Sequence, residues 1–130
     1  MSLNVRVITP DKVVWDATVE ELILPSSTGQ IGILTDHAPL LTALDIGVMR
    51  LKSDAGWSSI VVMEGFAEVE DNKVTILCNG AEEGSSIDSA TAQSELERVT
   101  LLVDEATTKK EKIEATLELR KAKARLQAVA

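Results

Sequence analysis

Residues 65–78 read Gly-Phe-Ala-Glu-Val-Glu-Asp-Asn-Lys-Val-Thr-Ile-Leu-Cys, and this stretch decides the fold class. Two short apolar runs, Phe66–Val69 and Val74–Cys78, lie on either side of Asp71 and Asn72. Two-residue loops of the Asn, Asp and Gly type favour the primed turns whose twist matches that of the flanking strands. The stretch therefore predicts a tight β-hairpin.

The same pattern extends toward the N-terminus. Short apolar or alternating runs, separated by turn residues such as Pro10-Asp11-Lys12, predict an antiparallel all-β domain. Each strand is too short and too one-sided to be buried alone, so we expect two sheets packed face to face. The prediction is a β-sandwich over residues 1–84. Its other strands are expected at Leu3–Val7, Val13–Trp15, Val19–Leu24, Ile31–Leu34, Leu40–Leu44, Val48–Leu51 and Trp57–Met63.

The pattern changes after the break at Asn79–Ser86, which is rich in Gly, Ser and Glu. Apolar residues then recur at steps of three and four, as they do on one face of a helix. One stripe follows Asp88, a good N-cap residue, and a second follows Thr107-Thr108-Lys109-Lys110. Residues 85–130 are therefore predicted to form an antiparallel two-helix hairpin. The stripes are Ala92, Leu96, Val99, Val103 and Ala106, then Ala115, Leu119, Ala122, Leu126 and Val129.

The apolar stripe of the second helix is mostly Ala and Leu. At about 25 cal/mol per Å² of buried apolar surface, small side chains stabilise a seam less than Leu, Ile and Phe would. Terminal helices with few buried contacts are among the parts of a structure that unfold locally at the lowest free energy. We therefore expect a hairpin that can detach.

Charge and hydropathy exclude several classes of protein. The 130 residues carry a net charge of −8, so a basic face for nucleic acid is lacking outside the extreme C-terminus. No run approaches the roughly 20 apolar residues that cross a bilayer, and Met1–Arg6 lacks the layout of a signal peptide. We expect no membrane insertion and a cytoplasm-like compartment. The lone Cys78 is expected to be a buried small hydrophobe.

Groups for catalysis are scarce. The sequence has one histidine, His37, no tyrosine, and no Cys/His spacing for a metal or glycine pattern for a phosphate. The acidic pairs Glu20-Glu21, Glu82-Glu83 and Asp104-Glu105 are interpreted as solvated surface, because adjacent side chains point in different directions. His37 lies in a predicted loop, where a structural or contact role is favoured. The sequence predicts no active site and no metal.

Two motifs carry a resemblance to a known family. Gly29-Gln30-Ile31-Gly32-Ile33-Leu34 continues into Asp36-His37-Ala38-Pro39-Leu40, and Gly65–Val69 is followed by Asn72–Leu77. Together they resemble the epsilon subunits of F-type ATP synthases, most of all the cyanobacterial and chloroplast branch, over the whole chain. The resemblance implies a non-catalytic rotor subunit on the cytoplasmic or stromal side of a coupling membrane, here the thylakoid.

The resemblance also implies partners. The sandwich would join the gamma subunit to the ring of c subunits, with Gln30 facing the c ring and His37 near gamma. The helices would extend into the alpha and beta subunits and block ATP hydrolysis, with Arg120, Lys121, Lys123 and Arg125, the basic cluster, meeting acidic segments. The residue types alone fit a solvated helix face equally well, because cations near a helix C-terminus interact favourably with the helix dipole.

Some relatives bind ATP through an Ile-Asp-x-x-Arg-Ala motif with further arginines. On that resemblance the nucleotide-binding positions are Asp88, Arg98 and Arg125. Thr91 stands where the motif has arginine. Lys121 stands where another arginine is usual, and lysine lacks the bidentate fork of arginine. We therefore expect no cofactor, and ATP binding is disfavoured.

Two alternatives remain open at this point. One is a stand-alone β-sandwich that binds proteins and carries a helical tether, although only Trp15, Trp57 and Phe66 could supply an aromatic groove. The other is a small carboxylate-dependent enzyme, for which no convergent pair is visible. Co-purification with gamma separates both from a rotor subunit.

Overall fold

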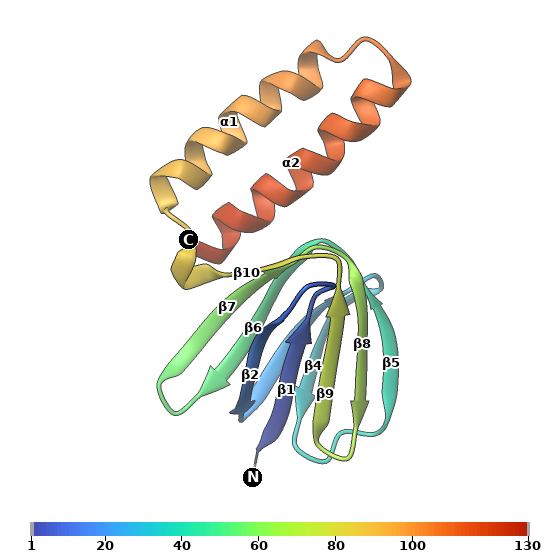
Figure 1. Cartoon of the computed structure of the whole chain (residues 1–130), viewed down its shortest axis with the longest axis vertical. Coiled ribbons are helices and arrows are strands. Elements are labelled where there is room, and N and C mark those ends of the chain that lie inside the picture. The colour runs from blue at the N-terminus through green and yellow to red at the C-terminus, as the bar shows by residue number, and fades with distance from the viewer. Residues whose placement is uncertain (1, 130) are drawn as a thin grey trace.

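The computed structural model describes residues 2–129, and in that range the chain forms ten strands and two α-helices, with a short 3-10 helix between the two parts. Figure 1 shows a strand domain and a pair of long helices beyond one of its ends. The strands are β1 (Leu3–Ile8), β2 (Val13–Val19), β3 (Glu21–Ser26), β4 (Gly29–Leu34), β5 (Leu40–Leu44), β6 (Gly47–Ser53), β7 (Gly56–Val62), β8 (Gly65–Glu70), β9 (Lys73–Cys78) and β10 (Ala81–Glu83). The helices are η1 (Gly84–Ser86), α1 (Ser89–Glu105) and α2 (Lys109–Val129).

The two layers of the sandwich belong to one hydrogen-bonded sheet. Its order is β10-β7-β6-β3-β5-β8-β9-β1-β2, with β4 also paired to β3. Strand β3 joins the layers, because its start, Glu21–Ile23, pairs with β6 and its end, Ser26, pairs with β5. The expected sandwich is thus confirmed, with its layers continuous at β3 rather than separate.

The hairpin at residues 65–78 has the predicted geometry. Glu70 pairs with Lys73, and Asp71 and Asn72 between them have φ values of 50° and 62°. Two consecutive positive φ angles are the mark of a type I′ turn, which twists as the strands do. Alternate residues of β8 and β9 then face inward, so Ala67, Val69, Val74, Ile76 and Cys78 join the main core.

Cys78 is buried, as expected, and burial raises the pKa of its thiol.

One pairing departs from the antiparallel expectation. Strand β1 runs parallel to β9, from Asn4 beside Lys73 to Ile8 beside Leu77. A parallel pair needs a long connection, and almost the whole sandwich lies between these strands. The sequence carries no local signal for such a pairing.

Strand β10 was not predicted, because it lies inside the break at Asn79–Ser86. It is short and pairs only with β7 among the described strands, from Ala81 beside Val62 to Glu83 beside Ile60. Its composition, Ala-Glu-Glu, has low strand propensity. Its pairing to β7 therefore decides its conformation.

Both helices begin at side-chain caps. The predicted cap of α1 is confirmed, because an Asp88 carboxylate oxygen accepts the Thr91 amide at 2.9 Å. Helix α2 begins at Lys109, two residues earlier than expected. There the Thr108 hydroxyl accepts the Glu111 amide at 3.1 Å, and the Glu111 carboxylate accepts the Thr107 amide at 3.1 Å. This close variant of a capping box fixes the start.

Helix α2 lies nearer the strands than α1 does (Figure 1), and it contacts β6 and β7. The buried side chains of α2 in the described range are Ala122 and Ala124. Ala124 belongs to a small apolar cluster between hairpin and sandwich, with Val48, Val61 and Met63 and the partly buried Ile46, Ile87 and Ala128. Neither α1 nor α2 is long and apolar enough to cross a membrane, and no other helix within residues 2–129 is.

Candidate interaction surfaces

An apolar row crosses the outer face of the sheet. The cross-strand neighbours Ala43, Phe66, Leu77 and Ile8 come from β5, β8, β9 and β1, and we call them the outer row. The exposed fractions of Phe66 and Leu77 are 57% and 52%. An open groove of about 680 Å³ lies at this end of the strands, lined among others by Ile8, Pro10, Phe66 and Leu77.

The next row along the same strands is mostly polar. Leu41 is followed across the sheet by Glu68, Thr75 and Arg6, and Arg6 pairs with Asp16 at 3.5 Å. The apolar surface is therefore bounded on one side by charges. Large exposed apolar patches with polar rims mark surfaces that bind partners.

Gln30 and His37 lie at opposite ends of β4. Gln30 lies just before the expected strand Ile31–Leu34, but it is the second residue of β4, paired with Pro25, because the turn of this hairpin is only Ser27-Thr28. His37 follows the other end of the strand, and its amide donates to the Leu34 carbonyl at 3.2 Å. The two residues cannot therefore contribute to one compact site.

The loop that carries His37 is fixed to the β8–β9 turn. The Asp36 amide donates to the Asn72 side-chain oxygen at 2.6 Å, and the Asn72 side-chain nitrogen donates to the Asp36 carboxylate at 3.1 Å. The Nδ1 atom of His37 lies 2.7 Å from the Ala38 carbonyl oxygen. No catalytic partner of His37 is present among residues 2–129, and no group of acidic, His or Cys residues in that range could hold a metal.

The members of the basic cluster have different neighbours. Arg120 lies 4.0 Å from the carboxylate of Asp45, and Lys121 lies 3.5 Å from that of Glu118. Lys123 is exposed and has no ion pair with any residue from 2 to 129. Two members of the cluster, Arg120 and Arg125, thus contact the sandwich.

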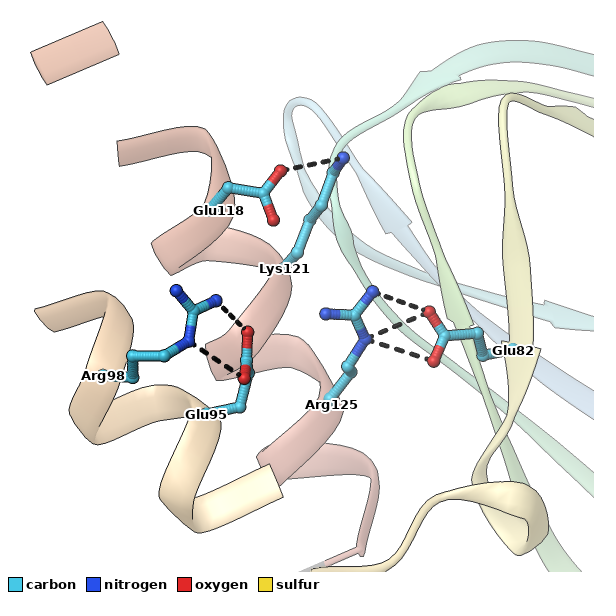
Figure 2. A network of polar contacts seen from close by, with 6 residues as sticks. All are labelled: Glu82, Glu95, Arg98, Glu118, Lys121 and Arg125. Atoms are coloured by element: carbon cyan, nitrogen blue, oxygen red, sulfur yellow. Dashed lines mark hydrogen bonds and ion pairs between the residues drawn. The ribbon is translucent and has the colours of Figure 1, made fainter. Parts of the chain in front are cut away.

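The closest of these contacts joins Arg125 to Glu82 on β10 (Figure 2). The Nε atom of Arg125 donates to both Glu82 oxygens at 3.1 and 3.0 Å, and Nη2 donates to Oε2 at 2.9 Å. Hydrogen bonding to Glu82 raises the pKa of the Arg125 guanidinium. The interpretation of Glu82 as solvated surface is therefore wrong, because a partner 43 residues away in the sequence engages it.

The three nucleotide-binding candidates are also engaged within the chain. Asp88 accepts hydrogen bonds from the Thr91 amide at 2.9 Å and the Thr91 hydroxyl at 2.8 Å, and both lower the pKa of Asp88. Arg98 pairs with Glu95 one turn earlier, and Arg125 pairs with Glu82 (Figure 2). The guanidinium groups of Arg98 and Arg125, which would meet a phosphate, are thus already paired with carboxylates of the protein.

Family models cover residues 2–130. Residues 2–84 match the model described as ATP synthase, Delta/Epsilon chain, beta-sandwich domain, and residues 85–130 match the one described as ATP synthase, Delta/Epsilon chain, long alpha-helix domain. The chain is 84% identical over 130 residues to the chloroplastic ATP synthase epsilon chain of Emiliania huxleyi, with 100% of both covered. It is 63% identical over 129 residues to the chain of the same name from Guillardia theta, covering 99% of this chain and 98% of the other.

A solved structure shares the fold. One chain of the Euglena gracilis mitochondrial ATP synthase, in a cryo-EM structure of OSCP, F1 and c-ring in rotational state 1, superposes with a TM-score of 0.85. The alignment covers 99% of this chain and 82% of that chain at 19% identity. At that identity the likeness shows the fold, including the helical pair beside the sandwich.

Proposed function

This chain belongs to the ATP synthase delta/epsilon family, as an epsilon subunit, and from that premise we propose that its sandwich attaches to the rotating central stalk while its helices restrain ATP hydrolysis. An epsilon chain is a subunit of the synthase and has no catalytic role of its own. Its proposed work is mechanical: it couples gamma to the c ring, and its helical hairpin regulates the direction of turnover.

The outer row is the observation that carries the proposed attachment. Phe66 and Leu77 expose more than half of their side chains next to an open groove, in a chain with few aromatic residues. The cores of protein interfaces are more apolar than the rest of the surface and are enriched in aromatic residues such as Phe. We assign the outer row to gamma, and the β3–β4 turn with Gln30 to the c ring. His37 is assigned to a second contact with gamma.

The basic cluster supports the proposed restraint of hydrolysis. In the folded hairpin Lys123 faces solvent, while Arg120 and Arg125 contact carboxylates of the sandwich. When the hairpin extends, all of them become available to acidic segments of the alpha and beta subunits. Charge complementarity at such a surface affects mainly the association rate and its salt dependence.

We also propose a location for the assembly. The relatives at 84% and 63% identity are named as chloroplastic chains, so this subunit would belong to a thylakoid ATP synthase and lie on its stromal side. Attachment would run through gamma and the c ring rather than through lipid.

Reassembly of a chloroplast-type complex tests the proposal. The test variant replaces Arg120, Lys121, Lys123 and Arg125 by alanine, and the control replaces Lys109, Lys110 and Lys112, which lie on the same helix outside the cluster. We expect the test variant to keep gamma bound while ATP hydrolysis rises, and the control to hydrolyse as the wild type does. Equal hydrolysis by all complexes would refute the regulatory role, and loss of the whole chain from gamma would refute the attachment.

A further inference from the structure

Two carboxylates of the sandwich form ion pairs with α2. Glu82 on β10 binds Arg125 through Nε and Nη2 at 2.9–3.1 Å, and Asp45, just after β5, lies 4.0 Å from Arg120. Within residues 2–129, these are the ion pairs that join the hairpin to the sandwich. Both use members of the basic cluster.

The apolar contact beside them is small. Ala124 and Ala128 are the side chains that α2 contributes to the cluster with Val48, Val61 and Met63. Alanine buries little area, so apolar burial holds this contact weakly. A bidentate arginine–carboxylate pair is among the stronger polar contacts, because both partners are charged and the geometry is planar. The Glu82–Arg125 pair is therefore the main polar contact between α2 and the sandwich within residues 2–129.

From this geometry we infer that Glu82 is an intramolecular competitor for the basic cluster, holding the hairpin folded by occupying the arginine that an acidic partner would bind. The inference rests on the proposed function, because it assigns a state to the hairpin that regulates hydrolysis. Asp45 forms a second ion pair with α2 at Arg120, five residues before Arg125. An N–H of Arg125 that donates to Glu82 is unavailable to another carboxylate.

Partial exposure makes this contact sensitive to salt. The side chains of Glu82 and Arg125 are 37% and 28% exposed, so solvent and ions reach the pair. Ionic strength screens exposed pairs over about 8–10 Å near physiological salt. Rising salt should thus loosen the folded hairpin in the isolated chain.

The chain contains its own reporter of this equilibrium. Both tryptophans, Trp15 and Trp57, line a cavity of about 270 Å³ together with Gly84 and Ala128 near the end of α2. Departure of α2 removes Ala128 from this cavity and exposes more of the Trp15 indole to water, whereas Trp57 is already 51% exposed. Tryptophan fluorescence therefore follows hairpin release in the full-length chain without a label.

The test compares Glu82→Gln with Glu83→Gln in the full-length chain. Both residues lie on β10, both substitutions remove one negative charge, and the Glu83 side chain forms no ion pair within residues 2–129. We expect Glu82→Gln to raise amide exchange in α2 by roughly tenfold and to shift the tryptophan emission to the red. Glu83→Gln should match the wild type. Unchanged exchange of the Ile76 and Val62 amides shows that the sandwich stays folded.

A charge exchange gives the second arm. Glu82→Arg combined with Arg125→Glu restores the pair with reversed polarity, so it should return α2 exchange to near the wild-type level.

In reassembled complexes, Glu82→Gln should also lower ATP hydrolysis, because more hairpins extend. If α2 exchange in Glu82→Gln equals that of the wild type, the inference is overturned whatever hydrolysis does. Faster amide exchange in α2 with unchanged hydrolysis would support the Glu82 contact and overturn the proposed regulatory function instead.

Discussion

Phe66 of β8 and Leu77 of β9 are direct cross-strand neighbours, and both point away from the core of the sandwich. Such pairs contribute about 0.2–1 kcal/mol to sheet stability, because their side chains touch across the strands. The folded chain alone gains little from leaving them this exposed. Their position in the outer row instead suits an interface with another subunit.

Replacement of this pair should weaken binding to gamma. We expect Phe66→Ser with Leu77→Ser to cost about 2 kcal/mol or more of binding free energy, roughly a 30-fold rise in Kd, while thermal stability changes little. Trp57→Ser is the matched control, because Trp57 is 51% exposed but lies on β7, outside the outer row. Calorimetric titration of gamma measures both. Equal losses from the pair and from Trp57 would argue against the outer row as the interface.

Gly65, the residue before Phe66, should not tolerate a side chain. A Cβ atom there would lie 2.0 Å from the Leu77 carbonyl oxygen and 2.7 Å from the Cys78 Cα, both backbone atoms. We expect Gly65→Ala to cost about 3 kcal/mol of unfolding free energy, and to lower the melting temperature by about 10 °C. Gly32→Ala is the control, since a Cβ at Gly32 meets nothing within 4 Å. Calorimetric melting curves of the two variants should differ clearly, and equal curves would contradict the close approach of β9.

Local chemistry explains which parts of the fold were predictable. The type I′ turn at Asp71-Asn72 and the cap at Asp88 depend on residues within a few positions, so the sequence contains their full signal. The parallel pairing of β1 with β9 and the strand β10 depend on partners far along the chain. No window of sequence around β10 distinguishes it from a loop.

The interaction surfaces divide in the same way. Phe66 could have been placed outside, because it shares a strand face with Glu68 while Ala67 and Val69 alternate with them on the core face. The role of Glu82 could not have been predicted, because it comes from Arg125 on a helix that folds back only in the tertiary structure. Adjacent acidic residues on a strand give the same pattern whether or not an arginine reaches one of them.

The cap at Asp88 predicts a pH dependence at the start of α1. Hydrogen bonds from the Thr91 hydroxyl, then from the Thr91 amide, lower the pKa of Asp88 from its ordinary value of 3.8. A lowered folded-state pKa means that the stabilisation is complete above 3.8 and is lost as pH falls through the folded pKa. The Thr91 amide resonance should therefore titrate with a midpoint below pH 3.8. Asp88→Asn retains a capping oxygen without the charge, so its Thr91 amide should show no such step. A Thr91 step in Asp88→Asn as large as in the wild type would assign the titration to another group.

The nucleotide site of some relatives should be inactive in this chain. We expect calorimetric titration with magnesium ATP to give no binding heat with the wild type, because Thr91 replaces the motif arginine and binds the Asp88 carboxylate. Arg98 and Arg125 are paired with Glu95 and Glu82, and a phosphate would have to displace both carboxylates. The net charge of −8 opposes an anion further.

Restoring the motif distinguishes a missing cation from occupied arginines. If the arginine alone is lacking, Thr91→Arg with Lys121→Arg should bind ATP, since arginine supplies the bidentate contact that threonine and lysine cannot. Thr100→Arg in place of Thr91→Arg is the control, because Thr100 is an exposed threonine of the same helix whose hydroxyl bonds only the Leu96 carbonyl among the described residues. If Thr91→Arg with Lys121→Arg binds only after Glu82→Gln is added, the Glu82 carboxylate is the remaining competitor. Wild-type binding at micromolar ATP would show instead that the internal pairs yield readily to phosphate.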